Sequence, residues 1–270
     1  MITVVQPATL GAQGVVRTDR PVITDPFFYL VAIPAVLLLG LSKSGFGAGF
    51  GSLAVPMMAL AVSVPDAAAI FMPLLFVMDV LTLKAFRKEL SWPLLRFMLP
   101  WGMLGIVVGA LLFKALDQHT VAGLVGLFAW GFLAQRKLFP PHADAPPPGR
   151  SWGAVLTTTS GFTSFVSHSG GPPINAYVIP LRLAPTVFTG TLAAFFFVIN
   201  LSKWLPYAWL GLLDTRNLAT SAALLPFAPM GVWVGVKVAR RISMVWFYRL
   251  VDWGMFLTGA KLIWDGFVAR

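Results

Sequence analysis

Four stretches of this 270-residue chain are apolar and contain no Asp, Glu, Lys or Arg. They cover residues 44–65, 151–181, 183–202 and 217–236. A membrane-spanning helix needs about 20 mostly apolar residues, because each residue advances the helix by about 1.5 Å. The whole chain is 57% hydrophobic and only 11% charged, which leaves too few charges to cover a soluble protein of this size. The sequence therefore predicts a protein that crosses the bilayer several times.

The composition argues against several classes of function. The chain has no cysteine and three histidines, so we expect no disulfide, no thiolate chemistry, no metal site and no cofactor. The motifs H-E-x-x-H and G-x-S-x-G and paired carboxylates are absent from the sequence, so we do not expect an intramembrane enzyme. The net charge of +10 comes from basic residues spread among short loops. This distribution favours membrane topology and lipid head groups over nucleic acid as its cause.

The apolar pattern predicts an all-α fold in two halves. We expect residues 1–25 to form an N-terminal tail, residues 26–139 the first transmembrane repeat and residues 151–270 the second. A proline-rich linker over residues 140–150 separates them, because proline cannot continue a helix. The predicted segments are 27–43, 52–64, 67–84, 95–114 and 120–138 in the first repeat, and 151–167, 172–182, 185–205, 217–238 and 244–266 in the second.

Short matches recur in the two halves in the same order. They pair Pro100, Gly105 and Gly109 with Pro226, Gly231 and Gly235, Phe76–Asp79 with Phe197–Asn200, and Ser44–Phe46 with Ser160–Phe162. Because each half holds an odd number of segments, the second half would lie upside down in the membrane, as in many secondary transporters. We predict two inverted repeats whose broken or re-entrant helices meet near the bilayer midplane. Basic loops then fall on one face, which is cytoplasmic by the positive-inside rule, and both termini are periplasmic.

A glycine-rich break follows the first predicted segment. SKSGFGAGFGSLAVP, Ser42–Pro56, has four glycines in seven residues, and each costs about 1 kcal/mol inside a helix. Such a break is tolerated at membrane depth where it is buried in protein or lines a polar cavity. A helix restarting near Ser52 would aim N–H groups at an anion there, whereas the alternative reading is close helix packing through small residues. The candidate substrate ligands are Lys43, Gly45, Gly49, Gly51 and Ser52.

A second break lies at Gly170–Pro173, where two prolines suit the first turn of a new helix. Polar side chains surround it, namely Ser164, Ser167, His168, Ser169 and Asn175. Polar capacity within an apolar run suggests a lined cavity. His168 could donate to an anion, carry a proton, or bond to a carbonyl. The candidate substrate ligands here are Ser167, His168, Gly170, Gly171 and Asn175.

Ionisable residues occur inside two predicted spans. Asp79 has Asn200 as its repeat partner, and Lys203 follows Asn200 by three residues, so both lie on one helix face. Charged groups cost several kcal/mol in a bilayer unless they are paired or hydrated. We predict Asn200 and Lys203 as substrate ligands and Asp79 as a proton- or cation-coupling residue. A nearby Lys43 would instead make Asp79 an ion-pair partner.

From about residue 30 to 266, the chain resembles the TauE/SafE family of sulfite exporters. The shared features are a glycine-rich break ending in proline (Gly45–Pro56) and an alanine-rich helix ending in aspartate (Ala67–Asp79). The second half carries His168-x-Gly-Gly-Pro-Pro173, then Gly190-Thr191, Asn200-x-x-Lys203 and Pro206-Tyr207.

The resemblance implies transport of small sulfur-containing anions, such as sulfite, sulfonates or sulfoacetate, across a bacterial inner membrane. We therefore predict a secondary transporter that works by alternating access. An anion channel of the same architecture is the alternative. The expected partners are the anion and the lipid bilayer, and self-association is left open.

Overall fold

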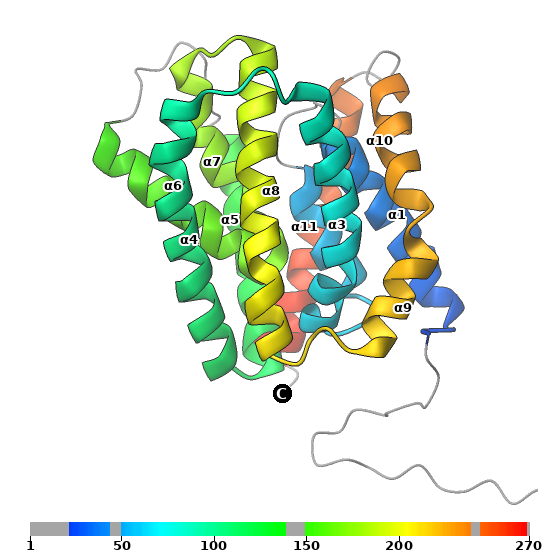
Figure 1. Cartoon of the computed structure of the whole chain (residues 1–270). Helices are drawn as coiled ribbons and strands as arrows, with labels where there is room; N and C mark the ends of the chain where they lie inside the picture. Colours follow the sequence, from blue (N-terminus) through cyan, green and yellow to red (C-terminus); the bar gives the residue numbers. More distant parts are fainter. Residues whose placement is uncertain (1–21, 44–49, 139–148, 239–243, 269–270) are drawn as a thin grey trace, which may run out of the picture.

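The computed structural model describes residues 22–43, 50–138, 149–238 and 244–268 (Figure 1). All regular elements in these ranges are helical, as predicted. The first part of the chain forms α1 (Pro26–Lys43), the 3₁₀ helix η1 (Phe50–Leu53), α2 (Ala54–Met58), α3 (Val64–Phe86), α4 (Trp92–Ala115) and α5 (Gln118–Leu138). The second part forms α6 (Arg150–Ser167), α7 (Gly171–Val178), the 3₁₀ helix η2 (Ile179–Leu181), α8 (Pro185–Trp209), α9 (Thr215–Leu224), α10 (Phe227–Val238) and α11 (Met244–Phe267).

The helix bounds follow the predicted segments with two differences. The segment predicted over 217–238 is divided, because α9 ends at Leu224 and α10 begins after Pro226. The segment predicted over 52–64 contains only the short η1 and α2, followed by turns. Helix α6 begins at Arg150, inside the predicted linker, and the rest of that linker and most of the predicted tail lie outside the described residues.

Four helices in the described ranges are long and apolar enough to cross a bilayer, namely α1, α3, α4 and α8. Large apolar side chains on these helices face outward, such as Leu30, which is 69% exposed, and Leu205, which is 80% exposed. A soluble surface rarely presents so many apolar groups, whereas lipid accepts them. The protein is a multi-pass membrane protein.

Local sequence explains where several helices begin. Ser63 precedes α3, and its hydroxyl accepts a hydrogen bond from the Asp66 N–H, with Pro65 in the first turn. Asp214 caps α9 in the same way, accepting from the Asn217 N–H at 2.7 Å. Such side chains satisfy N–H groups that have no partner within the helix. These caps fix the ends of two helices that pack against each other.

The helices pack in pairs. Helix α4 contacts α6, α1 contacts α10, α3 contacts α8, and α5 contacts α11. Figure 1 shows the α4–α6 pair on one side of the molecule and the α1–α10 pair on the other, with α3 and α8 between them. Glycines allow the closest approaches, because a Cβ added to Gly161 would lie 2.0 Å from the Gly102 carbonyl oxygen. These contacts place α3 and α8 at the centre of the bundle.

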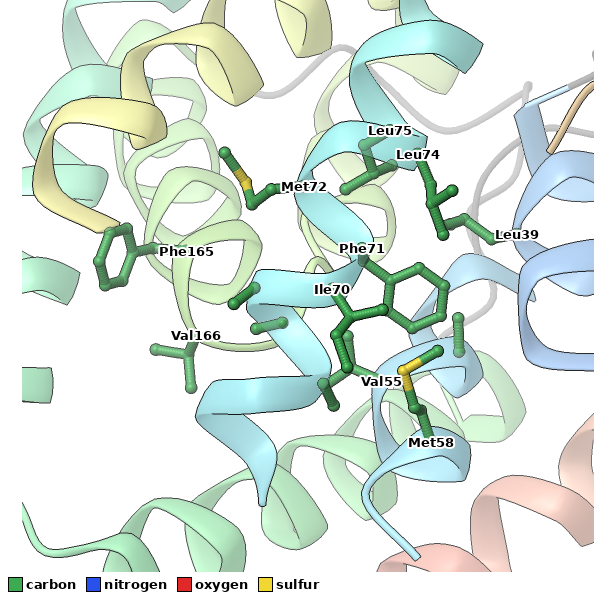
Figure 2. Close-up of a cluster of buried hydrophobic side chains, with 14 of the residues drawn as sticks. Leu39, Val55, Met58, Ile70, Phe71, Met72, Leu74, Leu75, Phe165 and Val166 are labelled. Carbon is green, nitrogen blue, oxygen red and sulfur yellow. The ribbon is translucent and has the colours of Figure 1, made fainter. Parts of the chain in front are cut away.

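A continuous apolar core surrounds the central helices. Figure 2 shows part of it. In this view Met58 of α2 lies below Phe71 of α3, and Leu39 of α1 lies above and to the right of Phe71. Phe71 and Met58 are completely buried. The same cluster reaches Phe165 at the end of α6. The core therefore holds the end of α1, the short helix α2 and the end of α6 against α3, which is where both predicted breaks lie.

Candidate functional site

A cavity lies where the ends of α1 and α6 and the start of α7 face the middle of α3 and α8. It is lined by Leu39, Ser42, Lys43, Gly51, Ser52, Leu75, Asp79, Thr82, Ser164, His168, Gly171, Pro172, Phe188, Thr189, Leu192, Ala193, Phe196 and Asn200. Its volume is about 100 Å³, and a water molecule occupies about 30 Å³ in the liquid. The space therefore suits an ion of a few heavy atoms.

Asp79 joins three helices at this cavity. Its carboxylate forms an ion pair with Lys43 at the end of α1 and accepts a hydrogen bond from the Asn200 side-chain amide on α8. Asp79 is 1% exposed, and the side chain of Lys43 is 17% exposed. The Lys43 ammonium also lies 5.1 Å from the centre of the Phe196 ring, a distance at which a cation is attracted to the ring face. The ion pair is the alternative role that the sequence left open for Asp79.

Lys203 is completely buried behind the polar wall of the cavity. Its Nζ lies 2.8 Å from the Ser164 carbonyl oxygen, 3.0 Å from the Ser164 hydroxyl and 2.9 Å from His168 Nδ1. A lysine ammonium has three N–H donors, and three polar atoms surround it here. In the described residues, no carboxylate lies within ion-pair distance of Lys203. The Lys203 amino group is therefore surrounded by neutral groups.

His168 closes the end of α6 and connects it to α3. Its backbone is left-handed with φ 53°, and the N–H groups of His168 and Ser169 bond back to the Ser164 and Thr163 carbonyls, so the helix ends in an αL cap. The ring Nε2 lies 2.9 Å from the Ala68 carbonyl oxygen. Because a carbonyl only accepts, we assign the ring proton to Nε2, which leaves Nδ1 to accept from Lys203. Of the roles open to His168, the structure displays the carbonyl bond.

The cavity brings together many of the predicted site residues. Lys43, Gly51, Ser52, Asp79, His168, Gly171 and Asn200 line it, and Lys203 lies directly behind it. Three others do not line it. Ser167 donates to the Thr163 carbonyl, the Gly170 carbonyl accepts from Ser160, and Asn175 is buried with no hydrogen-bond partner for its Oδ1. Gly45 and Gly49 lie outside the described residues, and the roles of all these residues remain predictions.

Several cavity residues were not among the predicted ligands. The polar ones are Ser42, Thr82, Ser164 and Thr189, and an apolar wall comes from Phe188, Leu192 and Phe196 of α8. Thr82 follows Asp79 by three residues, so the helical spacing that connected Asn200 with Lys203 also indicates Thr82. Ser164 belongs to the polar cluster around the second break. The sequence does not indicate that Ser164, rather than Ser167, reaches the cavity.

The family model of the sulfite exporter TauE/SafE matches residues 32–262. This match covers the cavity, both breaks and all the helices that line the site. The chain belongs to the TauE/SafE family. This match confirms the resemblance that the motifs indicated. TauE/SafE proteins are membrane transporters. No curated protein and no solved structure matches this chain.

Proposed function

We propose that this TauE/SafE protein is a secondary transporter that moves a small sulfur-containing anion, of the sulfite, sulfonate or sulfoacetate class, across the bacterial inner membrane. The observation that supports this most directly is the cavity at the centre of the bundle. Two lysines, Lys43 and Lys203, stand at or behind its wall, against one carboxylate, Asp79. A surplus of positive charge in a site shielded from water favours an anion.

The polar wall can also donate hydrogen bonds to such an anion. Ser52, Thr82 and Asn200 line the same cavity as Lys43. The Ser52 and Thr82 hydroxyls donate to Met255 Sδ and the Met78 carbonyl, so each would have to rotate to donate to the anion. Charge-assisted hydrogen bonds to an oxyanion are roughly twice as strong as neutral ones. Because the cavity is small, it would select for a compact head group.

The packing of the helices supports the two inverted repeats. Consider a two-fold relation that exchanges α1 with α6, α4 with α10, α3 with α8 and α5 with α11. It converts the α1–α10 contact into the α6–α4 contact and keeps α3–α8 and α5–α11 as pairs, and these are the four pairs observed. Alternating access in such transporters moves one repeat against the other around a central site.

Equivalent glycines support the same relation. Gly40 packs against Gly231, and Gly161 packs against Gly105. The residue numbers of Gly40 and Gly161 differ by 121, as do those of Asp79 and Asn200. This register makes Gly40 the counterpart of Gly161 in place of Gly45, which the sequence match had suggested.

The cavity extends toward the end of the bundle where α3 finishes and α8 starts, because Thr82, Phe188 and Thr189 line it. Four exposed basic residues lie at that end, namely Lys84, Arg87, Lys88 and Arg182, against one exposed acidic residue, Glu89. By the positive-inside rule this end is cytoplasmic. We propose that the described conformation is open toward the cytoplasm and that both termini are periplasmic.

Counterflow in proteoliposomes tests the proposal. Vesicles with the purified protein are loaded with unlabelled sulfite and diluted into a trace of labelled sulfite. With potassium equal on both sides and valinomycin present, no membrane potential drives the label. A transporter with alternating access then accumulates the label transiently above its equilibrium level, whereas an anion channel lets it equilibrate without an overshoot. We expect an overshoot, which Lys43→Gln abolishes and the exposed, distant Lys261→Gln leaves intact. Equilibration without overshoot would favour the channel, and no uptake with any small sulfur oxyanion would contradict the proposal.

A further inference from the structure

Three ionisable side chains, Lys43, Asp79 and Lys203, lie at the cavity or directly behind its wall. Among the described residues that line it, Lys43 and Asp79 are the only charged ones. Lys203 touches the cavity wall from behind, through Ser164 and His168. These three side chains come from α1, α3 and α8, so the central helices of both halves supply them.

The polar atoms around Lys203 can accommodate an ammonium group. The Ser164 carbonyl can only accept, and His168 Nδ1 accepts because the ring proton is on Nε2, toward the Ala68 carbonyl. The Ser164 hydroxyl can serve as a third acceptor. We treat Lys203 as charged on this basis, so that with Lys43 positive and Asp79 negative the empty site has a net charge of +1.

We propose that Asp79 makes this site selective for monoanions over dianions. This inference rests on the proposed function, because it concerns the anion that the cavity binds. A monoanion would bring the net charge of the site to zero. A dianion would leave one negative charge uncompensated in a medium of low dielectric, next to the Asp79 carboxylate. Such a site would take sulfite in its hydrogensulfite form and simple sulfonates directly, and within the proposed class it would disfavour sulfoacetate, which is a dianion at neutral pH.

The contacts of Asp79 explain why its charge remains in place. One carboxylate oxygen is bound to Lys43, and the other accepts from the Asn200 amide. Asn200 holds the equivalent position in α8 and is neutral. The pair Asp79–Asn200 therefore supplies one negative charge, and Asp79→Asn removes it with little change in shape. An aspartate in place of Asn200 would meet the Asp79 carboxylate at hydrogen-bond distance, and the two carboxyl groups would share a proton.

Methanesulfonate and sulfate make a matched pair of probes. Both are tetrahedral and nearly equal in size, but methanesulfonate has one negative charge and sulfate has two at neutral pH. Their affinities are measured by isothermal titration on the purified, detergent-solubilised protein at constant ionic strength. We expect the native protein to bind methanesulfonate and to bind sulfate at least about tenfold more weakly, a ratio that corresponds to about 1.4 kcal/mol.

Two variants move the charge in opposite directions. Asp79→Asn raises the site to +2, so the affinity ratio of sulfate to methanesulfonate should rise by at least about tenfold. Thr189→Asp adds a carboxylate elsewhere on the cavity wall and lowers the site to zero, so methanesulfonate binding should weaken by at least about tenfold and sulfate binding should be lost. Asp265→Asn makes the same chemical change on the exposed surface of α11, and it should leave the ratio unchanged.

The outcomes separate this inference from the proposed function. Binding of both probes with a ratio that neither cavity variant alters would overturn the inference and leave the transporter proposal standing. An equal shift in Asp265→Asn would show that overall charge sets the ratio, and would also overturn it. If the native protein binds neither these probes nor sulfite, the proposed function fails and this inference fails with it. Should Asp79→Asn not fold, Thr189→Asp decides the question by itself.

Discussion

The side chains of Asp79 and Asn200 meet at the centre of the molecule, where the Asn200 amide donates a hydrogen bond to the Asp79 carboxylate. Each is the sixteenth residue of its helix, Asp79 in α3 and Asn200 in α8. The contact joins positions that would be equivalent in the proposed inverted repeat. It also explains how an acidic residue can lie in an apolar helix, because a buried carboxylate needs a counter-charge and hydrogen-bond donors, and Lys43 and Asn200 provide them.

Close helix packing should depend on Gly161 and Gly105. A Cβ at Gly161 would lie 2.0 Å from the Gly102 carbonyl oxygen, and one at Gly105 would lie 2.1 Å from the Thr158 carbonyl oxygen. Because the obstacle is backbone, α4 and α6 must separate to admit a methyl group. We expect Gly161→Ala to destabilise the protein by about 1–3 kcal/mol, measured by thermal unfolding in detergent.

Gly131 provides the matched control for that substitution. It lies in α5 with nothing within 4 Å of its Cβ position. Gly131→Ala should therefore be neutral or stabilise by up to about 1 kcal/mol, because alanine favours a helix more than glycine does. Equal effects of alanine at Gly161 and Gly131 would contradict the close approach of α4 and α6.

Because the backbone at His168 is left-handed, glycine should be more stable than alanine at this position, which reverses the order expected inside a helix. Alanine in this conformation costs roughly 1–2 kcal/mol, whereas glycine adopts it freely. Both His168→Gly and His168→Ala remove the ring and its contacts with Lys203 and Ala68. We therefore expect His168→Gly to unfold at a higher temperature than His168→Ala.

The exposed Thr159 in the middle of α6 should show the opposite order. There, alanine should be more stable than glycine by about 1 kcal/mol, because the position is helical. If the alanine variant were also more stable than the glycine variant at His168, residue 168 would be helical. That result would contradict the end of α6 at Ser167 and the break that shapes the cavity.

The membrane orientation can be tested with two exposed lysines at opposite ends of α4. Lys88 precedes this helix and Lys114 lies in its last turn. The native chain has no cysteine, so Lys88→Cys and Lys114→Cys each introduce a single thiol. A membrane-impermeant thiol reagent added to intact cells should label the Lys114→Cys protein and spare the Lys88→Cys protein. The reverse pattern would place the basic loops outside and contradict the predicted topology.

The sequence predicted the helices well because apolar runs, glycines and prolines mark their ends directly. It did not predict the division of α9 from α10. Pro226 occupies the repeat position of Pro100, and Pro100 lies inside an unbroken α4. A proline weakens a helix at either place, and the packing of neighbouring helices decides whether the helix continues.

The cavity was predicted only in part, for a related reason. Residues identified by charge in an apolar run, such as Lys43, Asp79 and Lys203, do gather there. Among the serines near the second break, however, sequence gives no direction for each side chain. Ser164 faces the cavity while Ser167 bonds to its own helix. The apolar wall of α8 could not be distinguished from lipid-facing residues, because both are simply hydrophobic.

We propose that a small sulfur oxyanion binds between Lys43 and the His168–Lys203 pair. The most direct measurement is the affinity of sulfite for purified Lys43→Met, compared by isothermal titration with the native protein and with the exposed control Lys261→Met. We expect Lys43→Met to bind at least about tenfold more weakly, because a charge-assisted contact is lost, and Lys261→Met to bind as the native protein does. A folded Lys43→Met protein that binds sulfite with native affinity would contradict the account and place the site elsewhere.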